Sequence, residues 1–88
     1  MSYAYVMAGR AERYVSRLSP QLQRMIGVRL RELCAAPYDR DLSKPLKGPL
    51  QGKRSSELGS LRIIYEVDDT IRLLAIIDIG PRGDIYKR

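Results

Sequence analysis

The chain has 88 residues, enough for one domain and too few for two, so we expect a single domain over residues 1–88. Its 16 Lys and Arg residues outnumber its 10 Asp and Glu residues, and the formal charge of +6 favours a nucleic acid or an acidic protein as partner; a merely solvated surface is the alternative. Histidine is absent, which excludes His-based catalytic triads and most zinc sites.

The single cysteine and the hydropathy pattern bear on the compartment. Cys34 has no partner for an internal disulfide, and its apolar position in a predicted helix favours a buried thiol over a nucleophile. No segment approaches the roughly 20 apolar residues that span a membrane, and the first residues lack the basic-then-apolar pattern of a signal peptide. We therefore expect a cytoplasmic protein.

The chain begins with a predicted strand and a predicted helix. Residues 3–7 alternate weakly between apolar and polar side chains, as in a short strand, and Gly9 ends it. Over residues 10–18 apolar side chains recur at helical spacing. They are Ala11, Tyr14, Val15 and Leu18.

A second helix is predicted from Pro20 to about Ala35. Ser19 has the side chain of an N-cap, and Pro20 suits the first helical position. Apolar residues continue the 3.6-residue period up to Pro37, which closes the helix. The short break before Pro20 indicates that the two helices form an antiparallel hairpin.

Residues 37–52 predict a surface loop, because prolines and glycines interrupt any long regular element. The charge of this loop is mostly positive, so its expected role is electrostatic. The basic residues are Arg40, Lys44 and Lys47, against Asp39 and Asp41.

From Lys53 the hydrophobic period drops to two, which predicts strands joined by tight turns. Gly59-Ser60 suits a two-residue hairpin turn with glycine in the first position. The expected fold is α+β, of order β-α-α-β-β-β, with a helical hairpin packed on one face of a mainly antiparallel four-stranded sheet. The expected strands cover residues 53–58, 61–67 and 71–79, and residues 84–87 are a candidate for a short final strand.

Alternation along the predicted strands sorts side chains between a face that meets the helices and an open face. The residues expected against the helices are Leu61, Ile63, Tyr65 and Val67, then Ile71, Leu73, Ala75, Ile77 and Ile79. Those expected on the open face are Arg62, Ile64 and Glu66, then Arg72, Leu74, Ile76 and Asp78. A turn at Gly59-Ser60 also sets Glu57 across from Arg62 and Lys53 across from Glu66. Ordinary cross-strand ion pairs, each contributing no more than about 1 kcal/mol, are the structural alternative to a functional site.

Three ordered motifs in the C-terminal half resemble the RelE/ParE toxin superfamily. They are Leu46-Lys47-Gly48, the segment from Gly59 through Arg62 and Tyr65 to Asp68-Asp69, and the segment from Ile79-Gly80 through Arg82 and Asp84 to Tyr86. The N-terminal half agrees in its strand-helix-helix layout. The resemblance implies the toxin of a bacterial toxin–antitoxin pair, with a cognate antitoxin that wraps it.

RelE-like members cleave mRNA in the ribosomal A site, near 16S rRNA, leaving a 2′,3′-cyclic phosphate and a 5′-hydroxyl. The resemblance therefore implies a ribosome-dependent endoribonuclease that uses neither a metal ion nor an organic cofactor. ParE-like members share the fold but inhibit DNA gyrase and are not nucleases, and this stays the alternative. A small nucleic-acid-binding module without toxic activity is a third possibility.

The resemblance also assigns roles to residues. Arg62 matches the arginine that contacts the reacting phosphate, Arg82 matches one that stabilises the phosphate or the leaving group, and Tyr86 matches a tyrosine that stacks on or orients the nucleotide. Lys53 matches a basic residue of the preceding strand. We expect both arginines to converge on one place away from the helices. The further basic residues expected to bind RNA are Lys44, Lys47, Arg54, Lys87 and Arg88.

The sequence departs from the family pattern at positions near the expected general base, the group that would accept the proton of the attacking 2′-hydroxyl. Ser55 stands where RelE has a second basic residue, and Glu57 and Pro81 replace an arginine and a histidine that are frequent in relatives. A lysine with a pKa of about 10.4 is rarely neutral at pH 7 unless other cations crowd it, and Arg54 is one residue that could crowd Lys53. Glu57, already ionised, is the alternative base, so the choice between Lys53 and Glu57 stays open.

Overall fold

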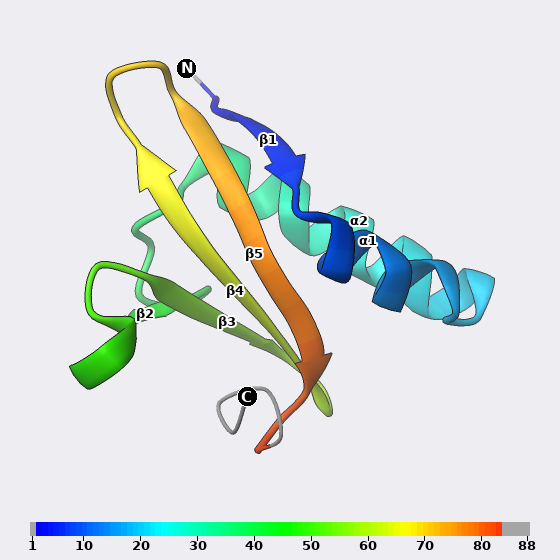
Figure 1. Cartoon of the computed structure of the whole chain (residues 1–88). Coiled ribbons are helices and arrows are strands. Elements are labelled where there is room, and N and C mark those ends of the chain that lie inside the picture. Colours follow the sequence, from blue (N-terminus) through cyan, green and yellow to red (C-terminus); the bar gives the residue numbers. More distant parts are fainter. Residues whose placement is uncertain (1, 84–88) are drawn as a thin grey trace.

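The computed structural model describes residues 2–83, which form two α-helices and five β-strands (Figure 1). In chain order the elements are β1 (Ala4–Met7), α1 (Gly9–Ser16), α2 (Pro20–Ala35), β2 (Lys44–Pro45), a 3-10 turn (Gly48–Leu50), β3 (Arg54–Leu58), β4 (Leu61–Asp68) and β5 (Leu73–Pro81). The predicted final strand at residues 84–87 lies outside the described residues. None of the described helices is long and apolar enough to cross a bilayer.

The start of α2 follows from its first residues. The Ser19 hydroxyl accepts a hydrogen bond from the Leu22 backbone N–H at 3.2 Å, and Pro20 occupies the first turn, where no N–H is needed. Cys34, near the end of this helix, is 7% exposed, and burial raises the pKa of its thiol. The predicted N-cap and the predicted buried thiol are both confirmed.

The sheet differs from the predicted one in strand number. Its five strands follow the order β1-β5-β4-β3-β2. β1 runs parallel to β5, whereas the other pairs are antiparallel, so the sheet is mixed. The four-stranded prediction was wrong because β2 is only two residues long and lies in the segment predicted as loop. Lys44 pairs with Ser55, and Pro45 pairs with Arg54.

A β-bulge corrects the predicted faces of β5. Ile64 pairs with Asp78, but Tyr65 pairs with Ile76, so Ile77 is an extra residue without a partner on β4. The bulge reverses the alternation, and it turns Leu74 and Ile76 into the core, where the sequence predicted Leu73, Ala75 and Ile77. Ile71 is likewise not in the core: it lies in the turn before β5 and is 64% exposed.

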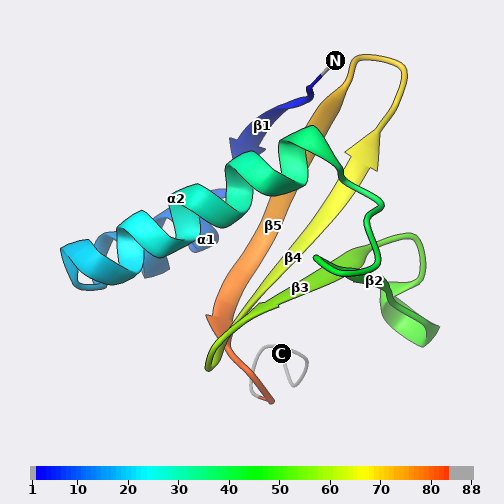
Figure 2. The ribbon, with the colours of Figure 1, turned by 180° about the vertical axis from the view of Figure 1, so that it is seen from behind.

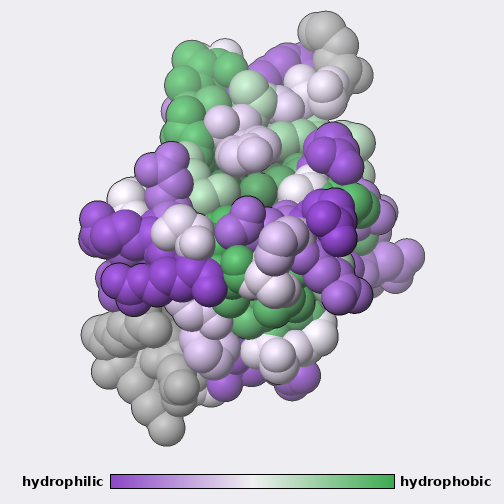
Figure 3. All heavy atoms as spheres, turned by 90° about the vertical axis from the view of Figure 1, so that its right-hand side faces the viewer, coloured by the Kyte–Doolittle hydropathy of each residue, from purple (hydrophilic) through white to green (hydrophobic). Residues whose placement is uncertain are grey.

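Both helices cover one face of the sheet, as Figures 1 and 2 show from the two sides. The core lies between these layers, and no α-helix of residues 2–83 covers the other sheet face, which we call the open face. Seen from the side where the helices end, hydrophilic residues form a band across the molecule, with apolar atoms exposed above it (Figure 3). The buried core consists of Ala11, Ile26, Leu30, Leu33, Cys34, Leu61, Ile63, Tyr65, Leu74, Ile76 and Ile79.

Candidate nucleic-acid interface

The β3–β4 hairpin brings an acidic and a basic side chain together on the open face. Gly59 adopts a φ of 60°, which suits glycine at the first position of the tight turn. The turn sets Glu57 opposite Arg62, as the sequence predicted. Arg62 Nη2 donates to Glu57 Oε2 at 2.5 Å, and the Arg62 side chain is only 11% exposed. The guanidinium is therefore held at a defined place.

Arg82 reaches the same carboxylate from the end of β5. Its backbone N–H donates to the Ser60 carbonyl at 2.9 Å, which fixes the chain beside the hairpin turn. Its guanidinium Nη2 lies 3.6 Å from Glu57 Oε1, and the side chain is 53% exposed. Arg62 and Arg82, which we call the arginine pair, thus meet on one carboxylate away from the helices. This is the convergence that the sequence led us to expect, with Glu57 occupying the meeting point.

The arginine pair changes the acidity of Glu57. The hydrogen bond from Arg62 is the main cause that lowers the pKa of Glu57, and the charges of Arg82, Arg62 and Lys44 act in the same direction. Partial burial opposes this effect and is the weaker influence. Glu57 is therefore ionised at neutral pH, and two guanidiniums can hold one oxyanion at this place.

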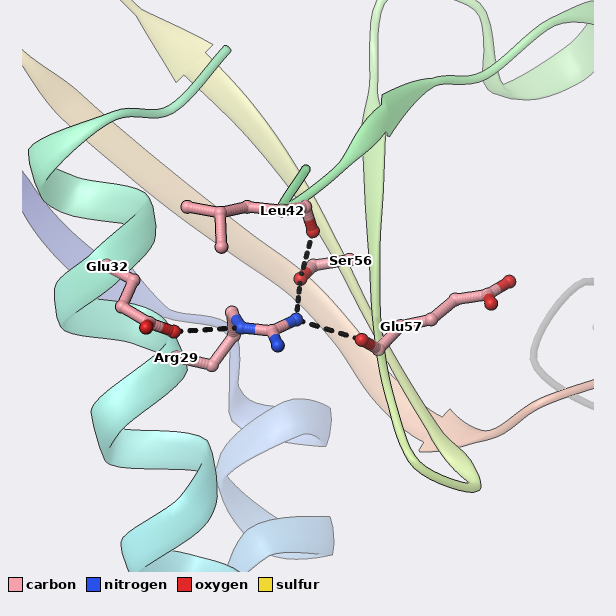
Figure 4. A network of polar contacts seen from close by, with 5 residues as sticks. All are labelled: Arg29, Glu32, Leu42, Ser56 and Glu57. Carbon is pink, nitrogen blue, oxygen red and sulfur yellow. Dashed lines mark hydrogen bonds and ion pairs between the residues drawn. The ribbon is translucent and has the colours of Figure 1, made fainter. Parts of the chain in front are cut away.

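A second arginine-centred network fixes the backbone beneath Glu57 (Figure 4). Arg29 of α2 donates from Nη1 to Ser56 Oγ and to the Glu57 carbonyl, both at 2.8 Å. Ser56 Oγ in turn donates to the Leu42 carbonyl at 2.7 Å, and Arg29 Nε pairs with Glu32 at 3.1 Å. The Glu57 side chain points away from Arg29 in Figure 4. The sequence analysis did not predict this contact between α2 and β3. The available signal was Arg29, a charged residue within the apolar stripe of α2.

Lys44 of β2 borders a hollow beside the arginine pair. The strand pairing sets Lys44 opposite Ser55, on the same face as Glu57. The hollow has a volume of about 170 Å³ and is lined by Arg40, Asp41, Leu42, Ser43, Lys44, Ser55 and Glu57. The open face therefore carries, next to the paired guanidiniums, a hollow of mixed charge, with Arg40 and Lys44 against Asp41 and Glu57.

No family model matches the chain, but individual known proteins do. It is 29% identical over 89 residues to the toxin RelG of Mycobacterium tuberculosis, a match that spans 100% of both chains. It is 37% identical over 46 residues to the toxin RelE of the same organism, which covers 52% of this chain and 47% of that relative. A solved toxin–antitoxin complex, RelBE2 of M. tuberculosis, has a chain that superposes with a TM-score of 0.79 at 25% identity, over 93% of this chain and 100% of that one.

The fold recurs in more distant RelE structures. A chain of the archaeal RelE–RelB complex of Pyrococcus horikoshii superposes with a TM-score of 0.76 at 22% identity, over 94% of this chain and 98% of that one. A free RelE mutant of Escherichia coli gives 0.79 at 22% identity, over 99% and 93% of the two chains. The chain is therefore similar to RelE-like toxins in sequence and in fold. The α+β fold of a RelE-like toxin is thereby established, with the five-stranded mixed sheet described above.

Other basic residues that the sequence singled out lie apart from the arginine pair. Lys53 shares the open face, but its Nζ lies 3.9 Å from Glu66 Oε2. It precedes Glu57 by four residues, which corresponds to about 13 Å along a strand. Lys47 is exposed in the segment before the 3-10 turn. Neither Lys53 nor Lys47 is brought to the meeting point of the arginine pair.

Arg54 points to the opposite face, so it does not crowd Lys53 as the sequence had suggested. Its Nε donates to Ser43 Oγ at 3.0 Å, and its guanidinium carbon lies 5.4 Å from the centre of the Tyr38 ring. Ser43 Oγ is 2.6 Å from the Tyr65 hydroxyl, which donates to the Pro37 carbonyl at 2.6 Å. Arg54 and the motif residue Tyr65 thus tie the 37–43 loop to the sheet.

The two motif aspartates of the RelE-like pattern also hold the fold. Asp68 accepts from the Thr70 backbone N–H at 3.0 Å and so shapes the β4–β5 turn. Asp69 accepts from the Tyr38 hydroxyl at 2.7 Å and from the Tyr3 hydroxyl. The remaining predicted site residues, Tyr86, Lys87 and Arg88, lie outside the described residues.

Proposed function

We propose that this RelE-like chain is the toxin of a toxin–antitoxin pair and acts as a ribosome-dependent endoribonuclease on mRNA in the A site. The observation that carries the proposal is the meeting of Arg62 and Arg82 on one carboxylate on the open face. A phosphodiester, like a carboxylate, presents two oxygens to guanidinium donors. A single anion placed there can therefore be bound from two directions.

The arginine pair would act on the charge that develops at phosphorus. Attack by the 2′-hydroxyl oxygen forms a new P–O bond and breaks the bond to the 5′-oxygen, giving a 2′,3′-cyclic phosphate and a 5′-hydroxyl. Donors that are already in place stabilise the added negative charge, an effect often worth a few kcal/mol. The half-exposed Arg82 is free to turn from Glu57 to the phosphate, while Arg62 is held by its surroundings.

Glu57 is our candidate for the group that accepts the 2′-hydroxyl proton. It contacts both arginines, whereas Lys53 is paired with Glu66 several residues away on the strand. The lowered pKa keeps Glu57 ionised and makes it a weak base, so positioning of the RNA by the ribosome would supply much of the rate. The departing 5′-oxygen would take its proton from water.

The proposed protein partner is a cognate antitoxin. The solved relatives include RelBE complexes from M. tuberculosis, P. horikoshii and E. coli, in which a RelE toxin is joined to RelB. The charge of +6 and the exposed apolar side chains of Tyr5, Val6 and Ile71 favour a partner that is acidic and partly apolar.

Primer extension on a translated message tests the proposal, beside a supercoiling assay with purified gyrase. We expect breaks in the message that require ribosomes, with 2′,3′-cyclic phosphate ends, and undiminished supercoiling. Arg24→Ala is the charge-matched control, because Arg24 is exposed on α2 and far from the open face in the fold. Inhibited supercoiling without mRNA breaks would replace the nuclease proposal with gyrase inhibition.

A further inference from the structure

The backbone of Glu57 lies where strand pairing on one side of β3 has ended. The hairpin turn is closed by the pair of Leu58 and Leu61, and in an antiparallel ladder every second pair exchanges backbone hydrogen bonds. The next pair, Glu57 with Arg62, therefore turns its backbone groups away from the partner strand. On that side β2 pairs only with Ser55 and the residue before it, so within residues 2–83 its ladder stops short of Glu57. The Glu57 carbonyl needs a donor from elsewhere.

Arg29 of α2 supplies this donor. Its Nη1 donates to the Glu57 carbonyl at 2.8 Å and to Ser56 Oγ at 2.8 Å. The Arg29 side chain is 19% exposed, and its Nε lies 3.1 Å from Glu32 Oε1, so the guanidinium is held from both sides. Figure 4 shows it reaching from the helix to β3, while the Glu57 side chain extends in the opposite direction. A helix on one face of the sheet thus fixes a residue that acts on the other face.

The position of the Glu57 backbone bears directly on the arginine pair. The Glu57 carboxylate contacts both Arg62 and Arg82, and the half-exposed Arg82 is aligned with Arg62 through this carboxylate. A shift of the Glu57 backbone would therefore displace the carboxylate and, with it, the two guanidiniums. A misplacement of about 1 Å at a reacting centre can cost roughly 100-fold in rate.

We propose that Arg29 is a positioning residue for mRNA cleavage: from the helix side it holds the Glu57 backbone, so that the Glu57 carboxylate keeps the arginine pair aligned for the phosphate. The proposal rests on the proposed nuclease function and adds to it a residue that acts only through Glu57. A purely structural role for Arg29 would instead lower the stability of the chain and leave the geometry of the folded site unchanged.

Single-turnover cleavage on ribosomes that carry a defined message separates positioning from binding. Arg29→Met keeps the apolar stem of the side chain and removes its donors. We expect its maximal rate to fall by roughly ten- to hundredfold, with no change in the toxin concentration that gives half of this rate. Arg29→Lys keeps a cationic donor and should recover most of the rate. Arg24→Ala, which removes the same charge from the exposed side of α2, should cleave as the wild type does.

An NMR titration of the Glu57 carboxyl carbon reports the same geometry without ribosomes. The hydrogen bond from Arg62 is the main cause that lowers the pKa of Glu57. If Arg29→Met lets the carboxylate move away from Arg62, the pKa of Glu57 should rise toward the ordinary value of a glutamate, and the acid limb of the cleavage profile should move to higher pH. Arg29→Lys and Arg24→Ala should keep the wild-type pKa of Glu57.

Tyr65→Phe controls for a general loss of stability. It removes a buried hydroxyl that bonds the segment before β2, in a network that does not include Glu57, so it should lose stability without changing the pKa of Glu57. Far-ultraviolet circular dichroism checks the fold of each variant. Arg29→Gln, with a shorter and uncharged side chain, gives the same comparison if Arg29→Met does not fold.

The outcomes separate the role of Arg29 from the nuclease proposal. A folded Arg29→Met with the wild-type pKa of Glu57, or with the wild-type maximal rate beside an active wild type, would overturn the role of Arg29. An equal rise of this pKa in Tyr65→Phe would assign the effect to lost stability and overturn it too. If the wild type cuts no translated mRNA, the nuclease proposal ends, whereas a raised pKa of Glu57 in Arg29→Met alone would still support the positioning of the carboxylate by Arg29.

Discussion

Glu57 is the central residue of the candidate site, because it contacts both members of the arginine pair. Its carboxylate accepts from Arg62 and lies beside Arg82, while its carbonyl accepts from Arg29 on the other side of the sheet. The hydrogen bond from Arg29 fixes the backbone of Glu57, and the arginine pair fixes the position of its carboxylate. A residue with these contacts can serve as a base, as a positioning group for the guanidiniums, or as both.

Replacing either member of the arginine pair should abolish most cleavage. We expect Arg62→Ala and Arg82→Ala each to lower the rate of mRNA cleavage by roughly 100-fold or more, because preorganised donors to the reacting phosphate are lost. Far-ultraviolet circular dichroism should show an unchanged fold for Arg82→Ala, whose side chain is half exposed. Cleavage at wild-type rates by both variants would remove the catalytic role of the pair.

Glu57→Gln separates a base from a positioning group. If Glu57 takes up the proton, single-turnover cleavage should fall strongly while RNA binding stays equal or tightens, since a negative charge beside the phosphate is removed. The pKa of Glu57 is lowered, so the carboxylate stays ionised down to below its usual range near 4 and the wild-type rate should be lost only in acid. A variant that cleaves as fast as the wild type would assign Glu57 to positioning alone.

The elements are joined to one another by a few buried polar links. Ser56 on β3, Arg29 on α2 and the Leu42 carbonyl before β2 form one such link. Tyr65 on β4 forms another through Ser43 and Pro37. Both hold the segment that ends in β2, so the cationic Lys44 is placed by contacts that lie on the helix side of the sheet.

Ser56→Ala should destabilise the fold, and Ser55→Ala should not. Removing the Ser56 hydroxyl leaves the Arg29 donor and the Leu42 acceptor short of a partner, so we expect a loss of about 1–3 kcal/mol in the free energy of unfolding. The Ser55 hydroxyl is unpartnered within residues 2–83, so its removal should leave the free energy of unfolding unchanged or raise it. Urea denaturation of both variants measures the difference, and equal losses would refute the assignment of the two serines to opposite roles.

Asp69 links β1 and the loop after α2 to the β4–β5 turn in a pH-dependent way. Hydrogen bonds from Tyr3 and Tyr38 lower the pKa of Asp69. The bond between Tyr38 and Asp69 also raises the pKa of Tyr38 to about 12. A lowered carboxyl pKa means that the stabilisation is present above the unfolded value of about 3.9 and is lost as pH falls through the folded pKa. The stabilisation that comes from the raised pKa of Tyr38 is present below the unfolded value of about pH 10, and it is lost as the pH rises toward 12.

Asp69→Asn should therefore be less stable than the wild type at neutral pH, and the difference should shrink in acid. Urea midpoints measured from neutral pH down to pH values below the carboxyl range check this expectation. Because both tyrosine hydroxyls lie near the surface, we expect a small effect. A difference that persists unchanged in strong acid would contradict the hydrogen-bonded arrangement.

At the scale of the whole molecule, a small basic domain with one open sheet face gains stability from a partner. A short chain buries a modest fraction of its surface on folding, so binding to the folded state contributes noticeably by mass action. Lys44, Lys53, Arg62 and Arg82 lie on the open face, where Glu57 and Glu66 pair with three of them, and an acidic partner segment would add to this compensation of charge.

The complex with the proposed antitoxin should unfold at a higher temperature than the free chain. The partner to look for is a small acidic or amphipathic reading frame next to this gene, and its product should be tested at several salt concentrations. We expect the increase in melting temperature to shrink as salt rises, since charge attraction is screened. The complex should also stop cleaving translated mRNA, and full activity at saturating antitoxin would contradict the proposed pairing.

Local patterns determined much of this protein. Ser19-Pro20 set the start of α2, Gly59-Ser60 set the hairpin register, and that register placed Glu57 opposite Arg62, because each depends on neighbours in the chain. Only the tertiary structure decided what depends on distant pairing: the parallel β1, the two-residue β2 that carries Lys44, and the bulge at Ile77 that reverses the faces of β5. The partners of Arg29 on β3 were likewise decided by the tertiary structure: its place in the apolar stripe of α2 signals a buried contact, but the spacing does not say which distant segment supplies it.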